Sequence, residues 1–270
     1  MDYFKLTKED LGKNSKIPIV ALGSAGEVFY EMALDMIQNI EENNAKGEKT
    51  VFICPVGPVG QYPIFVRLVN ERNVSLKNTW FFNMDEYLQD NDTYIDTENP
   101  LSFRGFMNRT VYNKIKPELV MPENQRVFPD PKNPEKLDEM LGALGGAQVC
   151  YGGIGITGHV AFNEPENVPV DEFGKRPTRK LSISPETRAV NSIGDLGGAI
   201  NAMPRRCITI GMKSILAAKK IRLYCFRDWH RAVVRQAAYG DVTASFPVTL
   251  VQNHPDARIT VTDNVDEAAF

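Results

Sequence analysis

The sequence predicts a single α/β domain over residues 1–270, built as a doubly wound, mostly parallel β-sheet with helices on both faces. Two observations predict this class. Short apolar, β-branched runs alternate with segments whose apolar residues recur at helical spacing, which is the pattern of repeated βαβ units. In addition, the chain has no internal repeat, low-complexity linker or break in composition that would mark a second domain.

The first half of the chain supplies strand-like runs at residues 16–22, 50–54 and 79–82. The run at 50–54 is β-branched and aromatic, as expected for a central strand. Ser24 and Glu27 have the spacing of a capping box, so a helix should begin directly after the first run. Apolar stripes at helical spacing predict further helices over residues 62–69 and 103–115, and the second of these stripes is expected to pack in the core.

The second half continues the alternation. Strand-like runs occur at residues 147–151, 207–211, 221–226 and 246–251, and residues 230–239 have a helical pattern. Two polar segments interrupt these elements: residues 89–100 should form a loop, and residues 165–180, rich in proline and charged residues, are predicted to form a mobile flap over the functional site.

Composition excludes several classes of protein. A net charge of −3 over 270 residues argues against a surface for nucleic acid or anionic membranes, and no apolar run is long enough to cross a bilayer. The first residues lack the layout of a signal peptide, so we expect a cytoplasmic protein. The four cysteines stand in apolar, strand-like runs without Cys-x-x-Cys spacing, which predicts buried reduced thiols: Cys54, Cys150, Cys207 and Cys225.

The most informative segment is the glycine-rich stretch at residues 152–165, which follows a predicted strand. In open α/β sheets, ligands bind at loops leaving the carboxyl ends of strands. The stretch contains His159 and, five residues later, Glu164, and a histidine near a carboxylate is suited to proton transfer. The alternative is a glycine-rich turn with an incidental histidine, and spacing alone does not decide between them.

The sequence of this segment, G-G-I-G-I-T-G-H-V-A-F-N-E-P, resembles the signature of the glucosamine-6-phosphate deaminase/isomerase family, roughly G-x-G-x-D-G-H-x-A-F-N-E-P. Three further segments follow the family's order and spacing: F-N-M-D-E-Y at 82–87, T-R-A-V-N-S at 187–192 and L-V-Q-N-H-P at 250–255. The resemblance therefore covers nearly the whole chain. The F-N-E-P ending distinguishes it from the related 6-phosphogluconolactonases.

The resemblance implies three catalytic residues. Asp85 matches the family's general base, which removes the C2 proton of an amino-sugar phosphate and returns a proton to C1. His159 matches the residue that moves a proton during ring opening, and Glu164 matches the carboxylate that orients this histidine. From the sequence alone, Asp85 could instead be a solvated carboxylate or a cap for a turn, and the adjacent Glu86 is expected to be structural.

The predicted substrate-binding residues depart from the family pattern. Thr157, before Gly158, replaces the family's aspartate, and a hydroxyl cannot carry charge at neutral pH. The segment of this chain that matches the family's phosphate loop is C-P-V-G-P-V-G at 54–60. In it, valines replace the family's hydroxyl residues, and Pro58 lacks an N–H group. The backbone amides that remain for binding are those of Gly57, Val59 and Gly60.

The family's cationic anchors for phosphate are changed as well. Ile193 stands where the family has an arginine, whereas Arg231 aligns with the family's lysine and would retain an anchor for an anion. A solvated helix face is the alternative reading of Arg231 and its neighbour Arg227.

Taken with these departures, the resemblance implies a cofactor-free, homo-oligomeric enzyme of amino-sugar catabolism that converts a small sugar phosphate to a ketose phosphate and ammonia. Two alternatives stay open: a diverged isomerase for a different sugar or sugar phosphate, and a non-catalytic sugar-binding paralogue. No His, Cys or carboxylate spacing indicates a metal site, and the glycine pattern is not followed by the acidic residue of a dinucleotide site.

Overall fold

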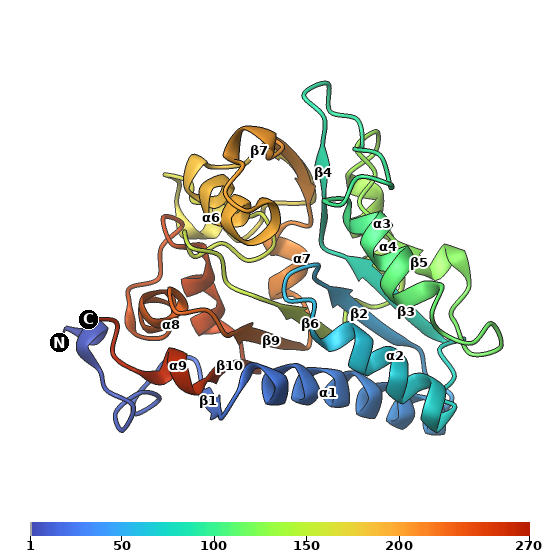
Figure 1. Cartoon of the computed structure of the whole chain (residues 1–270), viewed down its shortest axis with the longest axis horizontal. Helices are drawn as coiled ribbons and strands as arrows, with labels where there is room; N and C mark the ends of the chain where they lie inside the picture. The colour runs from blue at the N-terminus through green and yellow to red at the C-terminus, as the bar shows by residue number, and fades with distance from the viewer. Residues whose placement is uncertain (1) are drawn as a thin grey trace.

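The computed structural model describes residues 2–270, so residue 1 of the predicted domain lies outside the described part. Its centre is a seven-stranded sheet in which every pair of neighbouring strands is parallel (Figure 1). From edge to edge the strands are β1 (Ile19–Leu22), β10 (Ala257–Thr262), β9 (Lys220–Cys225), β6 (Val149–Gly152), β2 (Thr50–Cys54), β3 (Thr79–Asn83) and β5 (Arg126–Val127). The predicted mostly parallel sheet is confirmed.

Side chains alternate along the strands between two apolar cores, as a sheet covered on both faces requires. In β2, Phe52 and Cys54 face one core, whereas Val51 and Ile53 face the other. Helices α1 (Ala25–Lys46) and α2 (Gln61–Arg72) contribute to the first core, and α4 (Glu135–Ala143), α7 (Met212–Leu216) and α8 (His230–Tyr239) contribute to the second (Figure 1).

The chain path reverses direction within the sheet. From β2 the chain proceeds through α2 to β3 on one side, whereas from β6 it proceeds to β9 and β10 on the other. The loops after β2 and β6 therefore diverge, which leaves a crevice at the carboxyl ends of these two strands.

The predicted start of α1 is confirmed by its hydrogen bonds. The Ser24 hydroxyl accepts the amide of Glu27 at 3.2 Å, and the Glu27 carboxylate accepts the amide of Gly23 at 2.7 Å. The helix ends at Gly47, whose φ of 69° is the left-handed conformation that glycine adopts without strain. Such caps satisfy backbone groups that would otherwise lack partners.

A second, three-stranded antiparallel sheet adjoins the main one. It consists of β4 (Asp85–Leu88), β8 (Arg206–Thr209) and β7 (Arg179–Ser182), of which β4 begins after a single residue beyond β3. The strand predicted at 207–211 exists but belongs to this small sheet. The pairing of Asp85 with Thr209 fixes the backbone where the chain leaves the main sheet.

The strand predicted at 246–251 is wrong, because these residues form a 3₁₀ helix, Pro247–Asn253. Pro247 supplies no N–H group for a strand ladder, and the Thr249 hydroxyl donates to the carbonyls of Thr243 and Phe246 instead. The apolar side chains of this segment are buried, so hydrophobicity alone did not distinguish strand from helix. The last strand of the sheet is β10, which the sequence patterns did not identify.

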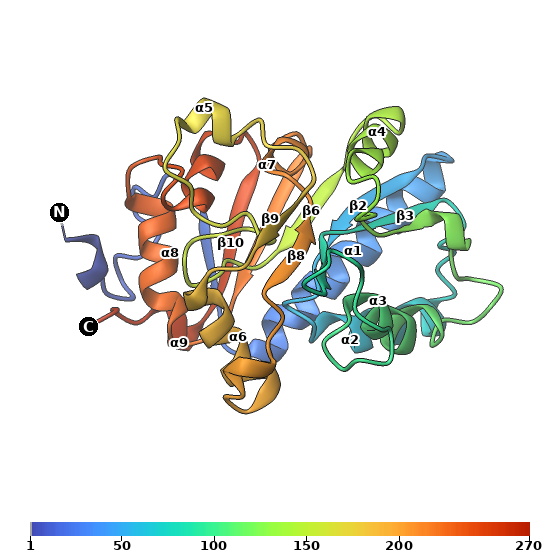
Figure 2. The same cartoon turned by 90° about the horizontal axis from the view of Figure 1, so that it is seen from above.

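The segment 165–180 does not cover the pocket described below. It contains α5 (Val170–Phe173), whose Phe173 side chain is fully buried in the main core. The Arg176 and Arg179 guanidiniums both bind Glu166, at 2.6 and 3.0 Å. Figure 2 shows α5 well apart from α3 (Phe103–Met107), which borders the pocket. The flap prediction is therefore wrong, because a buried aromatic residue and an ion-pair cluster fasten this segment elsewhere.

The remaining short elements complete the chain. They are a π-helical turn after α3 (Asn108–Tyr112), α6 (Pro185–Leu196), α9 (Asp263–Asp266) and 3₁₀ turns at Tyr3–Lys5, Glu123–Gln125 and Ile200–Ala202.

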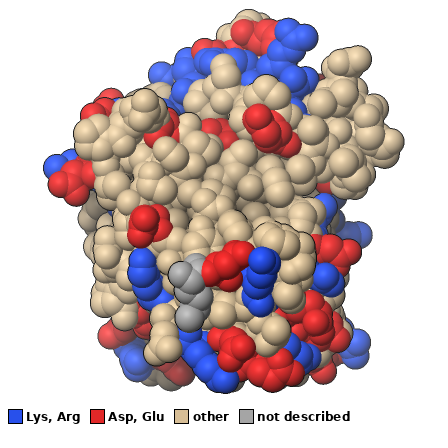
Figure 3. Space-filling view, turned by 90° about the vertical axis from the view of Figure 1, so that its left-hand side faces the viewer, with Lys and Arg blue, Asp and Glu red and all other residues tan. Residues whose placement is uncertain are grey.

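The surface and the cysteines agree with the composition. On the face shown in Figure 3, basic side chains gather at the upper edge, and acidic and basic side chains are mixed along the lower part. None of the helices in residues 2–270 has the length and apolar character that a membrane span needs. All four cysteines carry free, buried thiols.

Candidate active site

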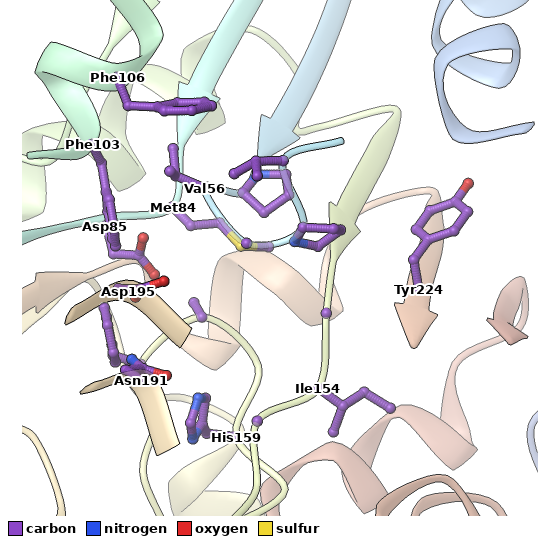
Figure 4. A pocket seen from close by; sticks show the side chains of 18 of the residues that line it. Val56, Met84, Asp85, Phe103, Phe106, Ile154, His159, Asn191, Asp195 and Tyr224 are labelled. Carbon is purple, nitrogen blue, oxygen red and sulfur yellow. The ribbon is translucent and has the colours of Figure 1, made fainter. Parts of the chain in front are cut away.

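A pocket of about 520 Å³ lies at the carboxyl ends of the parallel strands. Its walls come from the loop after β2 (55–60), the start of β4, the loop after β6 (153–155) and the loop after β9 (226–230). This is the crevice that the reversal of the chain path creates. Figure 4 shows Asp85 and His159 both directed toward this space.

Asp85 holds a buried carboxyl group at the pocket wall. Asp85 is 6% exposed, and within residues 2–270 the structure gives its carboxylate no hydrogen bond or ion pair. Burial raises the pKa of the Asp85 carboxyl well above its usual range, and the charge of Glu86 raises it further. A raised pKa makes this carboxylate a stronger proton acceptor, which suits a general base.

Glu86 has a structural position, as predicted. Its fully buried carboxylate accepts the Ser102 hydroxyl and the amides of Phe103 and Arg104, each at 2.9 Å, together with Arg104 Nε at 3.2 Å. The negative charge thus sits at the start of α3 and satisfies backbone groups that have no helical partner. Since Ser102 and Phe103 line the pocket, Glu86 fixes one of its walls.

We expect Glu86→Gln to lower the free energy of unfolding by about 2–3 kcal/mol. The amide carries no charge, and its NH₂ group would face the N–H and O–H donors that now bind the carboxylate. Urea unfolding at neutral pH measures this change. Glu98→Gln, on the exposed loop before α3, is the matched control. A loss no larger than that of the control would contradict this assignment.

The glycine-rich loop is shaped by contacts within the protein. A Cβ atom at Gly155 would lie 2.0 Å from the His159 ring, so only glycine lets the imidazole fold back onto this loop. Gly158 has a φ of +78°, and a Cβ there would lie 2.6 Å from the Phe246 ring. Gly158, predicted to bind substrate, therefore packs against Phe246 behind the pocket.

Thr157 joins His159 to Glu164. Its hydroxyl donates to Glu164 Oε2 at 3.0 Å and lies 2.8 Å from His159 Nδ1, which assigns the Nδ1 proton as the donor to Thr157. The direct distance from His159 Nδ1 to Glu164 Oε2 is 3.5 Å. The threonine hydroxyl thus contacts both groups beside their direct 3.5 Å contact, and Nε2 of His159 is left available on the pocket side.

Glu164 is ionised in this arrangement. Burial opposes its ionisation, but the hydrogen bond and charge of His159 outweigh burial and lower the pKa of Glu164 to about 2. The amide of Ser184 also donates to this carboxylate at 3.2 Å. A fixed negative charge therefore lies behind the imidazole throughout the neutral pH range. This charge can stabilise an imidazolium that forms at His159.

The other predicted binding residues divide into two groups. Gly57, Val59 and Gly60 line the pocket, whereas Arg231 does not. Arg231 Nε donates to the carbonyl of Asn264 at 2.6 Å, which ties α8 to α9. The arginine that lines the pocket is Arg227, in the loop before α8. The prediction of Arg231 as an anchor for an anion is not supported, because this side chain is used to join two helices.

Sequence reasoning did not assign His230, which the structure places in the pocket wall. Its Nδ1 accepts the amides of Phe226 and Arg227, at 3.1 and 2.9 Å, and its Nε2 donates to the carbonyl of Ile154 at 3.0 Å. Burial lowers the pKa of His230 to about 3. This neutral histidine therefore joins the loop after β9 to the glycine-rich loop, and no spacing in a single sequence reveals such a contact.

Two further sets of pocket residues come from segments that the sequence had singled out for other reasons. Phe103 and Phe106, expected to pack in the core, line the pocket. Asn191, within the T-R-A-V-N-S segment, donates to the Tyr87 hydroxyl at 3.1 Å, and both residues line the pocket. Residues 2–270 contain no group of three or more His, Cys, Asp or Glu side chains positioned to hold a metal ion.

Comparison with known proteins gives relatives over most of the chain, although no family model matches it. A glucosamine-6-phosphate deaminase from Lachnoclostridium phytofermentans is 30% identical over 207 residues, which cover 75% of this chain and 81% of the relative. A glucosamine-6-phosphate deaminase from Thermoanaerobacter pseudethanolicus is 27% identical over 237 residues, covering 86% of this chain and 89% of the relative.

Solved structures share the fold. A monomeric glucosamine-6-phosphate deaminase of the NagB superfamily has a TM-score of 0.79 at 22% identity, covering 92% of this chain and 98% of that chain. The 6-phosphogluconolactonase from Trypanosoma cruzi has a TM-score of 0.66 at 14% identity, with 92% and 94% covered. Together with the sequence relatives, these similarities confirm the family that the motifs indicated. The chain belongs to the glucosamine-6-phosphate deaminase family of enzymes.

Proposed function

We propose that this protein is a cofactor-free enzyme that isomerises an amino aldose to a ketose and releases ammonia, with Asp85 and His159 as its proton-transfer groups. The observation that carries the proposal is the placement of both residues in one pocket. Asp85 has the raised pKa of a general base, and His159 is backed by the ionised Glu164 through Thr157. Membership of the family supports the same reaction.

The proposed reaction has three proton-balanced stages. His159 first moves a proton from the C1 hydroxyl to the ring oxygen, so that the ring opens to the aldehyde. Asp85 then removes the proton from C2 while the oxygen on C1 takes a proton from the ammonium group on C2, which gives the enolamine; Asp85 returns its proton to C1 and leaves an imine at C2. Water finally adds to the C2 imine, which collapses to the ketose and ammonia. A single carboxylate can serve both carbons because C1 and C2 are adjacent.

The test is a panel of amino and neutral sugars, each with and without a 6-phosphate, assayed separately for ketose, for ammonia and for exchange of the C2 proton with solvent. Ketose and ammonia in equal amounts from an amino sugar support the proposal. Ketose without ammonia, obtained from a neutral aldose, would instead favour a diverged isomerase. Binding without exchange for every compound would indicate a non-catalytic sugar-binding paralogue.

A further inference from the structure

One end of the pocket is formed by the loop 55–60 and by residues packed against it. The rings of Phe29 and Phe226 lie edge to face with centroids 4.9 Å apart, and a Cβ atom at Gly60 would lie 2.3 Å from the Phe29 ring. The Arg227 guanidinium lies over the Phe226 ring, with Cζ 5.8 Å from the ring centroid. These contacts place Arg227 at the same end of the pocket as the start of α2, and we call it the α2 end.

The α2 end carries backbone donors without acceptors. The amides of Gly57, Val59 and Gly60 have no hydrogen-bond partner within residues 2–270. Gly60 is the N-cap of α2, a helix of 12 residues, and the first N–H groups of a helix have no acceptor inside it. The positive end of the helix dipole adds to these donors, so this loop suits an oxyanion.

Arg227 adds a cation to this end. It is the one Lys or Arg among the described lining residues, and no hydrogen bond or ion pair within residues 2–270 uses its guanidinium. A Cβ atom at Gly194 would lie 2.8 Å from Arg227 Nη1, so the guanidinium reaches α6. Burial raises the pKa of the neighbouring Asp195, and the charge of Arg227 acts in the opposite direction, but the structure gives these two side chains no ion pair.

The positions where the family has its cations lie outside the pocket lining in this chain. The side chain at Ile193 is directed to solvent, with the residue 73% exposed. Arg231 donates to the carbonyl of Asn264 at 2.6 Å. A cation that meets the substrate in this pocket must therefore come from a different position, and Arg227 is the described residue that offers one.

We propose that Arg227, together with the free amides at the start of α2, binds the anionic end of a phosphorylated substrate and thereby sets the preference for it over a neutral sugar. This inference rests on the proposed function. An independent sign that a ligand occupies the pocket is the buried Asp85 carboxylate, which has no partner among the described residues. A guanidinium suits this role because it can contact two phosphate oxygens through charge-assisted hydrogen bonds.

The experiment measures kcat/KM for glucosamine 6-phosphate and for glucosamine on the intact protein. We expect Arg227→Gln to lower the value for the phosphorylated sugar by about 10–100-fold, the loss of a charge-assisted contact, and to lower that for glucosamine much less. Arg227→Lys keeps the charge and should lose less than Arg227→Gln. Arg231→Gln removes the same charge outside the pocket lining, and it should leave the ratio of the two kcat/KM values unchanged.

A binding measurement separates this inference from the proposed function. Calorimetric titration with inorganic phosphate needs no turnover, and Arg227→Gln should weaken binding whereas Arg231→Gln should not. That result without ammonia or ketose release from either sugar would support the inference and contradict the proposed reaction. Equal losses on both sugars in Arg227→Gln, a change of the substrate ratio in Arg231→Gln instead, or failure of the parent protein to bind phosphate and glucosamine 6-phosphate would each overturn the inference.

Discussion

Asp85→Asn should abolish exchange of the substrate C2 proton with solvent while leaving substrate binding measurable. The amide keeps the size of the side chain but cannot accept the proton. Loss of a general base costs about 10²–10⁴-fold in rate, or roughly 3–5 kcal/mol of activation free energy. Deuterium uptake at C2, followed by NMR in ²H₂O, measures the step directly and does not depend on whether ammonia is released.

The same variant should be more stable than the parent near neutral pH. Burial raises the pKa of Asp85, so the folded protein holds the proton more tightly than the unfolded chain does. The stabilisation that comes from this tighter proton binding is present in full below the unfolded pKa of about 3.9, and it is lost as pH rises toward the raised folded pKa. The Asp85→Asn substitution removes that loss, because an amide does not titrate.

Urea unfolding of both proteins at pH 4 to 8 tests this point, with Asp90→Asn at an exposed position of the following loop as the control. The stability gain of Asp85→Asn should grow with pH, and the control should show no such trend. A gain in stability together with a loss of exchange would identify Asp85 as a residue kept for chemistry at a cost to the fold. Undiminished exchange would assign the base to another residue.

Much of the main sheet could be predicted because its strands are short apolar runs bounded by turn residues. The runs at 50–54 and 79–82 are central strands, and their burial follows from β-branched and aromatic side chains. The structure places Asp85 and His159 in one pocket, because carboxyl ends of parallel strands share one edge. Local pattern and sheet geometry were sufficient for these features.

The rest depends on contacts between distant parts of the chain. Arg227 and Arg231 stand four residues apart, and only the packing of α8 on α9 decides that one lines the pocket and the other binds the Asn264 carbonyl. The small antiparallel sheet forms because β4 meets β8 across more than a hundred residues. The Thr157 bridge arises from the fold of the glycine-rich loop, and the sequence showed only that a carboxylate was missing there.

His159→Gln should have the second large effect on activity, and it should depend on the form of the substrate. Glutamine keeps a polar group in the pocket wall but cannot carry a proton between the C1 hydroxyl and the ring oxygen. We expect a loss of about 10²–10⁴-fold in kcat/KM on the closed-ring sugar. An analogue that cannot close its ring bypasses this step, so its C2 exchange by Asp85 should fall much less.

Substitutions at Thr157 test whether the hydroxyl transmits the effect of Glu164 to His159. Thr157→Val keeps the volume but removes both hydrogen bonds, so we expect a smaller loss, about tenfold, again confined to the closed-ring substrate. Thr157→Asp puts a carboxylate in direct contact with the imidazole and should raise the ring-opening rate above that of the parent. Thr157→Ser retains the bridge and serves as the control.

The ionisation of Glu164 does not change in the neutral pH range. Because His159 lowers the pKa of Glu164 to about 2, Glu164 stays ionised at all pH values above about 4, and its stabilising contribution is lost only as pH falls toward that pKa. A change in the rate of ring opening between pH 5 and 8 therefore does not come from ionisation of Glu164. Equal losses on closed-ring and open-chain substrates in His159→Gln would show that the histidine holds the pocket together rather than opening the ring.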